Sequence, residues 1–152
     1  MGRLRAGELL TAAGAVGLLA ALFLPWVGPV EASAWSSLGW LVLALAVAAV
    51  AAGTWLVIAT AAGRPVTQVV GAAVLASTIA PIAFLVLLLR ALVFQPGPND
   101  FTTVRYGAWI GLLAAAALAV GAWWSLADER TDAPESAYTP PAPRPALPAQ
   151  SS

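Results

Sequence analysis

Few side chains in this sequence could take part in catalysis or bind a metal. The 152 residues include no cysteine and no histidine, which excludes disulfides, thiol nucleophiles, zinc sites built from these residues and histidine-ligated haem. Catalysis would then depend on hydroxyl or carboxylate groups arranged as an acid–base pair, and no pattern in the sequence predicts such a pair. We therefore expect no enzyme activity, no cofactor and no metal site.

A small set of charged and aromatic residues could instead contact a ligand or a partner protein. We call these residues, which are expected to gather at one end of the fold, the outer cluster: Glu31, Trp35, Trp40, Arg90, Asp100 and Arg105. Arg90 is the most unusual member because it lies within a long apolar run, where a charge must pair or reach water. It could extend to the lipid headgroups, or it could pair with Glu31 or Asp100.

The elements that must position this cluster are very apolar. Hydrophobic residues make up 61% of the chain and charged residues 9%, whereas soluble domains carry about 25% charged residues. The mean hydropathy is +0.86. This composition predicts an integral membrane protein in the lipid bilayer. The formal net charge of zero gives no indication of a nucleic-acid partner.

Four apolar runs predict four transmembrane helices packed as a bundle, because each is about as long as the 20 residues that a bilayer requires. The predicted spans are residues 9–27, 38–62, 66–94 and 106–126. The fold class is therefore expected to be all-α integral membrane, with one domain over residues 1–126. In an alternative interpretation, residues 1–34 are a cleaved signal peptide, since Ala32-Ser33-Ala34 resembles a cleavage site.

Two proline residues indicate where the predicted helices turn or bend. The sequence Gly63-Arg64-Pro65 predicts a tight turn that makes the second and third spans a helical hairpin. Pro81 lies inside the third span and cannot donate to the carbonyl of Ser77, so we expect a kink there. The hydroxyls of Ser77 and Thr78 could compensate for the lost backbone hydrogen bond.

The fourth span and the segment after it differ sharply in composition. Gly107 and Gly111 have the four-residue spacing that allows helices to approach closely, either within the chain or in a homo-oligomer. Residues 127–152 are rich in proline, alanine and charged residues, which predicts a disordered tail. Its Pro-x-x-Pro segments could bind a partner domain.

The distribution of arginine predicts the orientation in the membrane. Two arginines, Arg90 and Arg105, fall on one side of the predicted spans, and the other five fall on the opposite side: Arg3, Arg5, Arg64, Arg130 and Arg144. The positive-inside rule then places both termini in the cytoplasm of a multi-pass plasma-membrane protein. Most of the tryptophans are expected to lie at the two lipid interfaces, with Trp26, Trp35, Trp40 and Trp109 at the outer one.

Several short motifs resemble those of a known group of proteins. They are the ending Leu24-Pro25-Trp26, the opening Gly107-Ala-Trp-Ile-Gly111 of the last span and its exit at Asp128-Glu129. Over residues 1 to about 130 the chain resembles small uncharacterised four-helix membrane proteins of actinobacteria. The resemblance implies a multi-pass location in the plasma membrane and no established activity.

Two functions are consistent with these features. The first is an accessory or interaction protein of the cell envelope, which contacts partners through its outer loops or its proline-rich tail. Its predicted spans contain almost no polar residues, and a transporter needs polar groups to replace the hydration of its cargo. The alternative is a small oligomeric transporter or channel whose path would be lined by Pro81, Ser77, Thr78 and Arg90.

Overall fold

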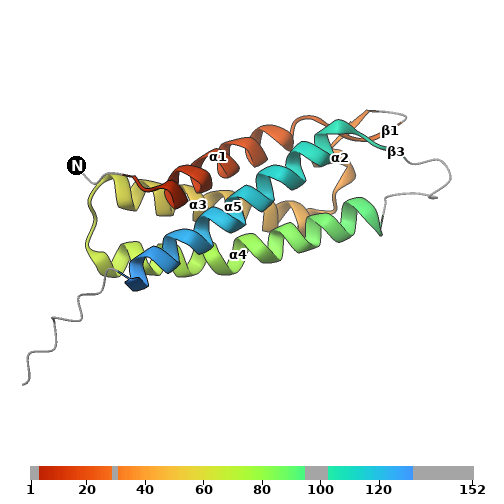
Figure 1. Ribbon diagram of the computed structural model, residues 1–152. Coiled ribbons are helices and arrows are strands. Elements are labelled where there is room, and N and C mark those ends of the chain that lie inside the picture. The colour runs from red at the N-terminus through yellow and green to blue at the C-terminus, as the bar shows by residue number, and fades with distance from the viewer. Residues whose placement is uncertain (1–3, 29–30, 95–102, 132–152) are drawn as a thin grey trace, which may run out of the picture.

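The computed structural model describes residues 4–28, 31–94 and 103–131, and it is mostly helical. Its helices are α1 (Ala6–Ala21), α2 (Ala34–Ser37), α3 (Trp40–Ala61), α4 (Val66–Leu92) and α5 (Tyr106–Thr131). All but the short α2 are long and lie side by side (Figure 1). Three of them, α3, α4 and α5, are long and apolar enough to cross a membrane. This composition supports the predicted membrane location.

The long helices pack in a ring in which each contacts two neighbours. Helix α1 packs on α5 and α3, and α4 packs on α3 and α5. The beginning of α1, the end of α5 and the turn between α3 and α4 lie at one end of the molecule (Figure 1). We call this the open end. The strands lie at the opposite end, which we call the sheet end.

The turn between α3 and α4 forms as the sequence predicts. Gly63 has a φ of +61°, a conformation that only glycine adopts without strain. The backbone N–H of Gly63 donates to the carbonyl of Thr60, and that of Arg64 donates to Ala59, each at 3.0 Å. This is the Schellman pattern that satisfies the last carbonyls of a helix. Pro65 then caps α4, so the hairpin is made by local sequence.

Helix α4 contains Pro81 within a single continuous helix from Val66 to Leu92. The hydroxyl of Ser77 donates to the carbonyl of Val74 at 3.1 Å, and that of Thr78 donates to the same carbonyl at 2.7 Å. Pro81 leaves the carbonyl of Ser77 without its helical donor. The two hydroxyls instead donate to the carbonyl of Val74, about one turn before Ser77 in the helix. A kink at Pro81 remains a prediction.

The first predicted span ends earlier than expected, and a small sheet follows it. Helix α1 stops at Ala21, whereas the sequence predicted a span over residues 9–27. Strand β1 (Pro25–Gly28) pairs antiparallel with β2 (Ala32–Ser33) on one side and β3 (Thr103–Val104) on the other. Pro25 cannot donate to a helical carbonyl and disfavours helix in the residue before it. The expectation of an entirely helical fold was therefore wrong at the sheet end.

The other helix limits lie near the predicted ones, with one correction at the last helix. Helix α3 and helix α4 begin and end within two residues of the predicted spans. Helix α5 continues to Thr131, beyond the predicted end at residue 126, so residues 127–131 are helical and do not belong to the tail. The remainder of the predicted tail lies outside the described residues.

Helices α1 and α5 approach each other closely through glycine. A Cβ added at Gly14 would lie 2.7 Å from the Cα of Leu118, and one added at Gly121 would lie 2.7 Å from the carbonyl oxygen of Gly7. The two backbones therefore touch where glycine removes the side chain. Such approach through small residues is how helices associate tightly in lipid.

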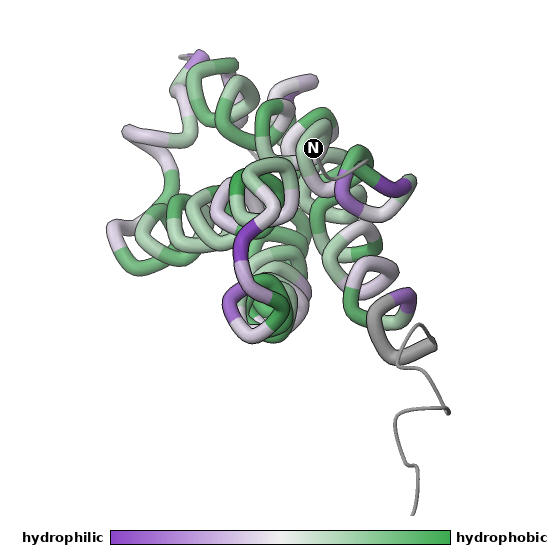
Figure 2. Tube along the Cα trace, turned by 90° about the vertical axis from the view of Figure 1, so that its left-hand side faces the viewer, coloured by the Kyte–Doolittle hydropathy of each residue, from purple (hydrophilic) through white to green (hydrophobic). Residues whose placement is uncertain are grey.

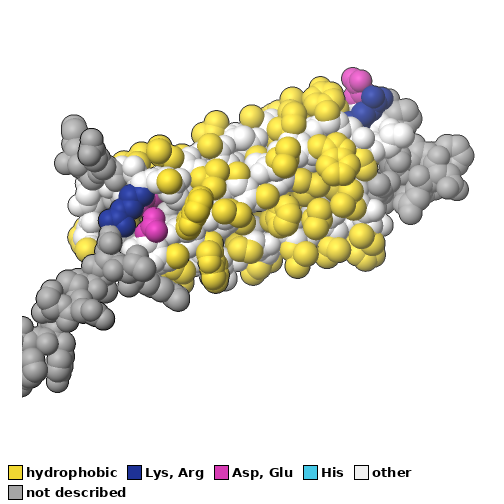
Figure 3. Space-filling view, in the orientation of Figure 1, with side chains coloured by type: hydrophobic (Ala, Val, Ile, Leu, Met, Phe, Trp, Pro, Cys, Tyr) yellow, Lys and Arg dark blue, Asp and Glu magenta, His cyan; other side chains and the backbone are white. Residues whose placement is uncertain are grey.

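The outside of the helices is apolar along its length. In Figure 3 the charged side chains on the visible face lie at its two ends, and the surface between them is hydrophobic. The trace in Figure 2 is predominantly green along the helices, with purple segments in the turns and at helix ends. This distribution matches a protein whose middle lies in hydrocarbon and whose ends reach water.

Candidate functional site

The described residues of the outer cluster lie at the sheet end, where two segments far apart in sequence meet. In the sheet, Val27 pairs with Val104 and Gly28 with Thr103. The backbone N–H of Arg105 also donates to the carbonyl of Trp26 at 2.9 Å. The pairing therefore joins the segment after α1 to the segment before α5, and it fixes the start of α5 against the first connection.

Trp26 anchors the sheet to the helices. Its side chain is 1% exposed, and its indole Nε1 donates to the carbonyl of Ala21 at 2.7 Å. That carbonyl, in the last turn of α1, also accepts from the backbone N–H of Leu24 at 3.1 Å. Trp26 was expected to lie at the lipid interface, and this was wrong because its ring is packed inside the protein.

Gly107 and Gly111 provide the surface against which this anchor packs. A Cβ at Gly111 would lie 2.8 Å from Cη2 of Trp26, and a Cβ at Gly107 would lie 2.8 Å from the Cβ of Leu24. The two glycines thus leave room for the segment that follows α1. Their spacing, predicted from the sequence to mark close packing, is used here within the chain.

Arg105 lies across the sheet instead of extending directly from it. A Cβ added at Gly28 would lie 2.7 Å from Nε of Arg105 and 2.6 Å from Oγ1 of Thr103. Among the described residues, the buried Nε of Arg105 has no hydrogen-bond partner. Gly28 is therefore required for the guanidinium to pass over the strand.

Three described members of the outer cluster, Glu31, Trp35 and Trp40, are exposed around the sheet. Glu31 lies between β1 and β2 with a φ of +52°, at an exposed position. The rings of Trp35 and Phe23 pack at a centroid distance of 5.6 Å. Trp40, the first residue of α3, is 76% exposed. These side chains offer contact area to lipid headgroups or to a protein.

Arg90 lies in the last turn of α4 and its side chain points toward the end of that helix. Its guanidinium donates a hydrogen bond to the backbone carbonyl of Phe94. In the described part of the cluster, Arg90 makes no ion pair with Glu31. Asp100, the other predicted partner, lies outside the described residues. The geometry fits a side chain that caps its own helix end and extends toward the surface.

A second group of polar residues is buried near the open end, where sequence reasoning expected no site. Glu8, Thr11 and Ser125 are each at most 5% exposed. The backbone N–H of Arg5 donates to the carboxylate of Glu8, which satisfies a donor in the first turn of α1. Thr11 donates to the carbonyl of Gly7 at 2.8 Å. Within the described chain, the hydroxyl of Ser125 has no partner.

The described polar groups of the two ends differ in kind from a metal centre. The described residues contain no group of three or more carboxylates or other metal ligands that could hold an ion. Among the described residues of the sheet end, the charged and aromatic groups are the exposed carboxylate of Glu31, the guanidinium groups of Arg90 and Arg105, and indole rings. Such groups recognise headgroups or protein surfaces through charge and aromatic contact.

The sheet itself was missed by sequence reasoning, although a weak signal existed. Both β1 and β3 contain a β-branched residue, Val27 and Val104, next to small or turn-forming residues, a composition typical of short strands. Comparison of the chain with protein-family models, with curated proteins and with solved structures finds no match.

Proposed function

We propose that this chain is an accessory or interaction protein of the cell envelope, and that its sheet end is the contact surface. The observation that carries the proposal is that exposed charged and aromatic side chains gather at the sheet end, whereas the flanks of the helices are apolar. The sheet end combines a sheet anchored by Trp26 with exposed Glu31, Trp35 and Trp40. A rigid base with exposed aromatic and charged side chains is typical of protein-binding surfaces.

The interior of the helices supports this function over transport. The buried polar residues in the described chain are Glu8, Thr11, Ser77 and Ser125. Thr11 and Ser77 use their hydroxyls on carbonyls of their own helices, so they offer little to a passing ion. A transport path requires groups that replace the hydration shell of the cargo.

The proposal includes α1 as a fourth membrane-crossing helix. Its 16 residues give a length of about 24 Å at 1.5 Å per residue, short of a hydrocarbon core of about 30 Å. The half-buried strand β1 extends the same apolar segment, and it pairs with β2 on one side and with β3 on the other. Paired backbone that is covered by protein can lie at membrane depth. We further propose a plasma-membrane location with cytoplasmic termini, as the arginine distribution predicts.

A small oligomeric transporter or channel is the second candidate. The buried carboxylate of Glu8 and the unpartnered hydroxyl of Ser125 near the open end favour it, because ionisable groups inside membrane helices mark ion paths. They lie far along the bundle from the sheet end, so the two functions use different residues.

Site-specific photocrosslinking in the native membrane tests the first function. A photoreactive amino acid at Glu31, on the sheet end, is compared with one at Arg64, which is exposed in the turn at the open end. We expect a discrete protein adduct from position 31 that is lost when Trp35→Ala is added, and no such adduct from position 64.

A flux measurement tests the second function with the same protein. The full-length chain is reconstituted in liposomes, and proton and monovalent-ion flux are recorded. We expect no flux above that of empty liposomes. Flux that depends on the protein and falls with Glu8→Gln would contradict the interaction function and support transport.

A further inference from the structure

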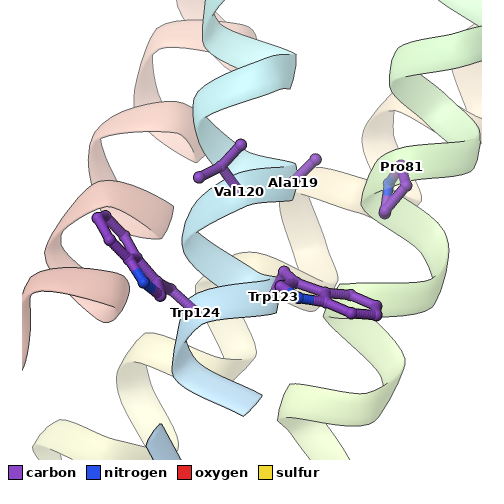
Figure 4. Close-up of a pocket in the computed structure, with 5 residues that line it drawn as sticks. All are labelled: Pro81, Ala119, Val120, Trp123 and Trp124. Atoms are coloured by element: carbon purple, nitrogen blue, oxygen red, sulfur yellow. The ribbon is translucent and has the colours of Figure 1, made fainter. Parts of the chain in front are cut away.

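The flank of the molecule between α4 and α5 has an apolar hollow with a volume of about 330 Å³. Five residues line it, Pro81 from α4 and four from α5: Ala119, Val120, Trp123 and Trp124. In Figure 4 the ring of Trp123 extends from α5 toward α4, on the side where Pro81 lies. Apart from the two indole nitrogens, the lining side chains have no polar atoms.

The hollow lies at a depth where the surroundings are apolar. Pro81 is near the middle of the 27-residue helix α4, and Trp123 and Trp124 are in the last turns of α5 before its charged end. Exposed side chains along both helices are large and hydrophobic, among them Val74, Leu75, Ile82, Leu85, Leu113 and Val120. The hollow therefore runs from the middle of the apolar surface toward the open end.

We propose that this hollow is a binding seat for an acyl chain of a membrane phospholipid, an inference that rests on insertion of the helices in a bilayer. A space of this volume left empty would forfeit the dispersion contacts of its walls. Water does not fill it, because apolar cavities without polar partners stay dry. The filling group must come from the side, where the acyl chains lie.

A second copy of the protein fits the hollow less well than an acyl chain. Close association of membrane helices uses small residues that let backbones approach. Here Val120, Trp123 and Trp124 are 54%, 64% and 53% exposed, and these large side chains line the hollow. They hold another helix away, whereas a thin flexible chain passes between them.

The indole rings also give the lipid a direction. Indole rings favour the boundary between acyl chains and headgroups, so the headgroup lies at the open end beside Trp123 and Trp124. The acyl chain then extends toward Pro81. Because Pro81 is near the middle of α4, the methyl end of the acyl chain lies close to it. The lipid thus belongs to the leaflet at the open end.

Photolabelling of the full-length protein tests this seat. The protein is placed in nanodiscs of phosphatidylglycerol with a trace of the same lipid that carries a diazirine near the methyl end of its acyl chain. After illumination, labelled positions are mapped by mass spectrometry. We expect labelling concentrated around Pro81 and Ala119, above that of the other outward faces.

Two substitutions of the same kind separate a specific seat from general lipid contact. Ala119→Phe fills the hollow and is expected to lower labelling there by about tenfold, which corresponds to about 1.4 kcal/mol of binding free energy. Ala51→Phe adds the same group at an exposed position of α3 and is expected to leave the labelling pattern unchanged.

Three results would overturn the proposal. They are even labelling along all outward helix faces of the parent, equal labelling of the two variants, and a parent dimer that Ala119→Phe converts to monomers. The first is read from the parent protein alone, so the test holds even if Ala119→Phe fails to fold.

Discussion

The direction of the Arg90 side chain decides how a charge is tolerated in the apolar run of α4. Its guanidinium donates to the carbonyl of Phe94, which lies two residues beyond the last residue of the helix, Leu92. The bond holds the side chain along the end of α4 and places its charge away from the middle of the apolar run. Arg105, by contrast, lies over Gly28 with a buried Nε. The two arginines of the sheet end therefore have different surroundings.

Substitution of Arg90 distinguishes a helix-capping role from a buried ion pair. We expect Arg90→Leu to change the free energy of unfolding by less than about 1 kcal/mol, because it removes one hydrogen bond near the surface. The measurement is thermal unfolding in detergent. If Arg90 were held in a buried pair, its removal would destabilise by about 3–5 kcal/mol.

Double substitution provides the control for Arg90. Arg90→Leu is combined with Glu31→Gln or with Asp100→Asn, and we expect the effects on stability to add, as they do for sites without a shared contact. Recovery of stability in either double variant would reveal a paired, buried arginine and would contradict the capping role.

At the scale of elements, glycines fix how closely α1 and α5 pack and which residues of the two helices face each other. Gly7 and Gly14 on α1 are seven residues apart, two helical turns, and so return to nearly the same face. They lie against Ser125 and Leu118 of α5, while Gly121 lies against Thr11 of α1. The same pair of helices carries the sheet at one end and the buried Glu8 near the other. A change in their spacing would therefore reach both ends.

A matched pair of glycine substitutions tests this contact. Gly14→Ala places a Cβ 2.7 Å from the Cα of Leu118, a backbone atom that cannot move alone, and we expect a loss of about 1–3 kcal/mol. Gly71→Ala makes the same change in α4, where a Cβ would meet nothing within 4 Å. There we expect unchanged or slightly raised stability, since alanine favours helix by about 1 kcal/mol.

Melting temperatures of the two variants and the parent, measured in the same detergent, provide the readout. Equal melting temperatures for Gly14→Ala and Gly71→Ala would show that α1 and α5 separate without loss, and that their close approach contributes nothing to stability.

At the scale of the whole molecule, charge is confined to the ends. The apolar flank seen in Figure 3 lies between them, and the start of α1 and the end of α5 share the open end (Figure 1). If α1 inserts together with α3, α4 and α5, the chain crosses the membrane four times. Because four is an even number, the start of α1 and the end of α5 then lie on the same side of the membrane. The sheet end lies on the other side, where the outer cluster could meet an external partner.

Cysteine labelling tests this topology, and the natural absence of cysteine removes background. Single cysteines replace Ser36 and Thr103 at the sheet end and Ser136 in the predicted tail. In intact cells we expect an impermeant thiol reagent to label Ser36→Cys and Thr103→Cys, and to label Ser136→Cys only after the membrane is permeabilised. Labelling of Ser136→Cys in intact cells would reverse the proposed orientation.

The sequence by itself determined the helical elements and the apolar nature of the protein. Long runs without charge predict membrane helices because a helix satisfies its own backbone hydrogen bonds within the hydrocarbon core. The turn at Gly63-Arg64-Pro65 was also predictable, since its residues specify a local backbone geometry that needs no distant partner. The sequence also predicted that the residues of the outer cluster gather at one end of the fold. It placed Trp26 at the lipid interface, whereas the ring of Trp26 is buried in the protein.

Only the tertiary structure decided the sheet, the burial of Trp26 and the hollow beside Pro81. Strand β1 is defined by pairing with β3, which lies far along the chain, and local sequence carries little information about such pairing. Periodicity at four residues drew attention to Gly107 and Gly111 but did not show what packs against them. The space they leave is occupied by Trp26 because α1 ends at Ala21. The sheet end and the hollow beside Pro81 therefore arise from contacts between segments that are distant in sequence, and local sequence patterns do not encode such contacts.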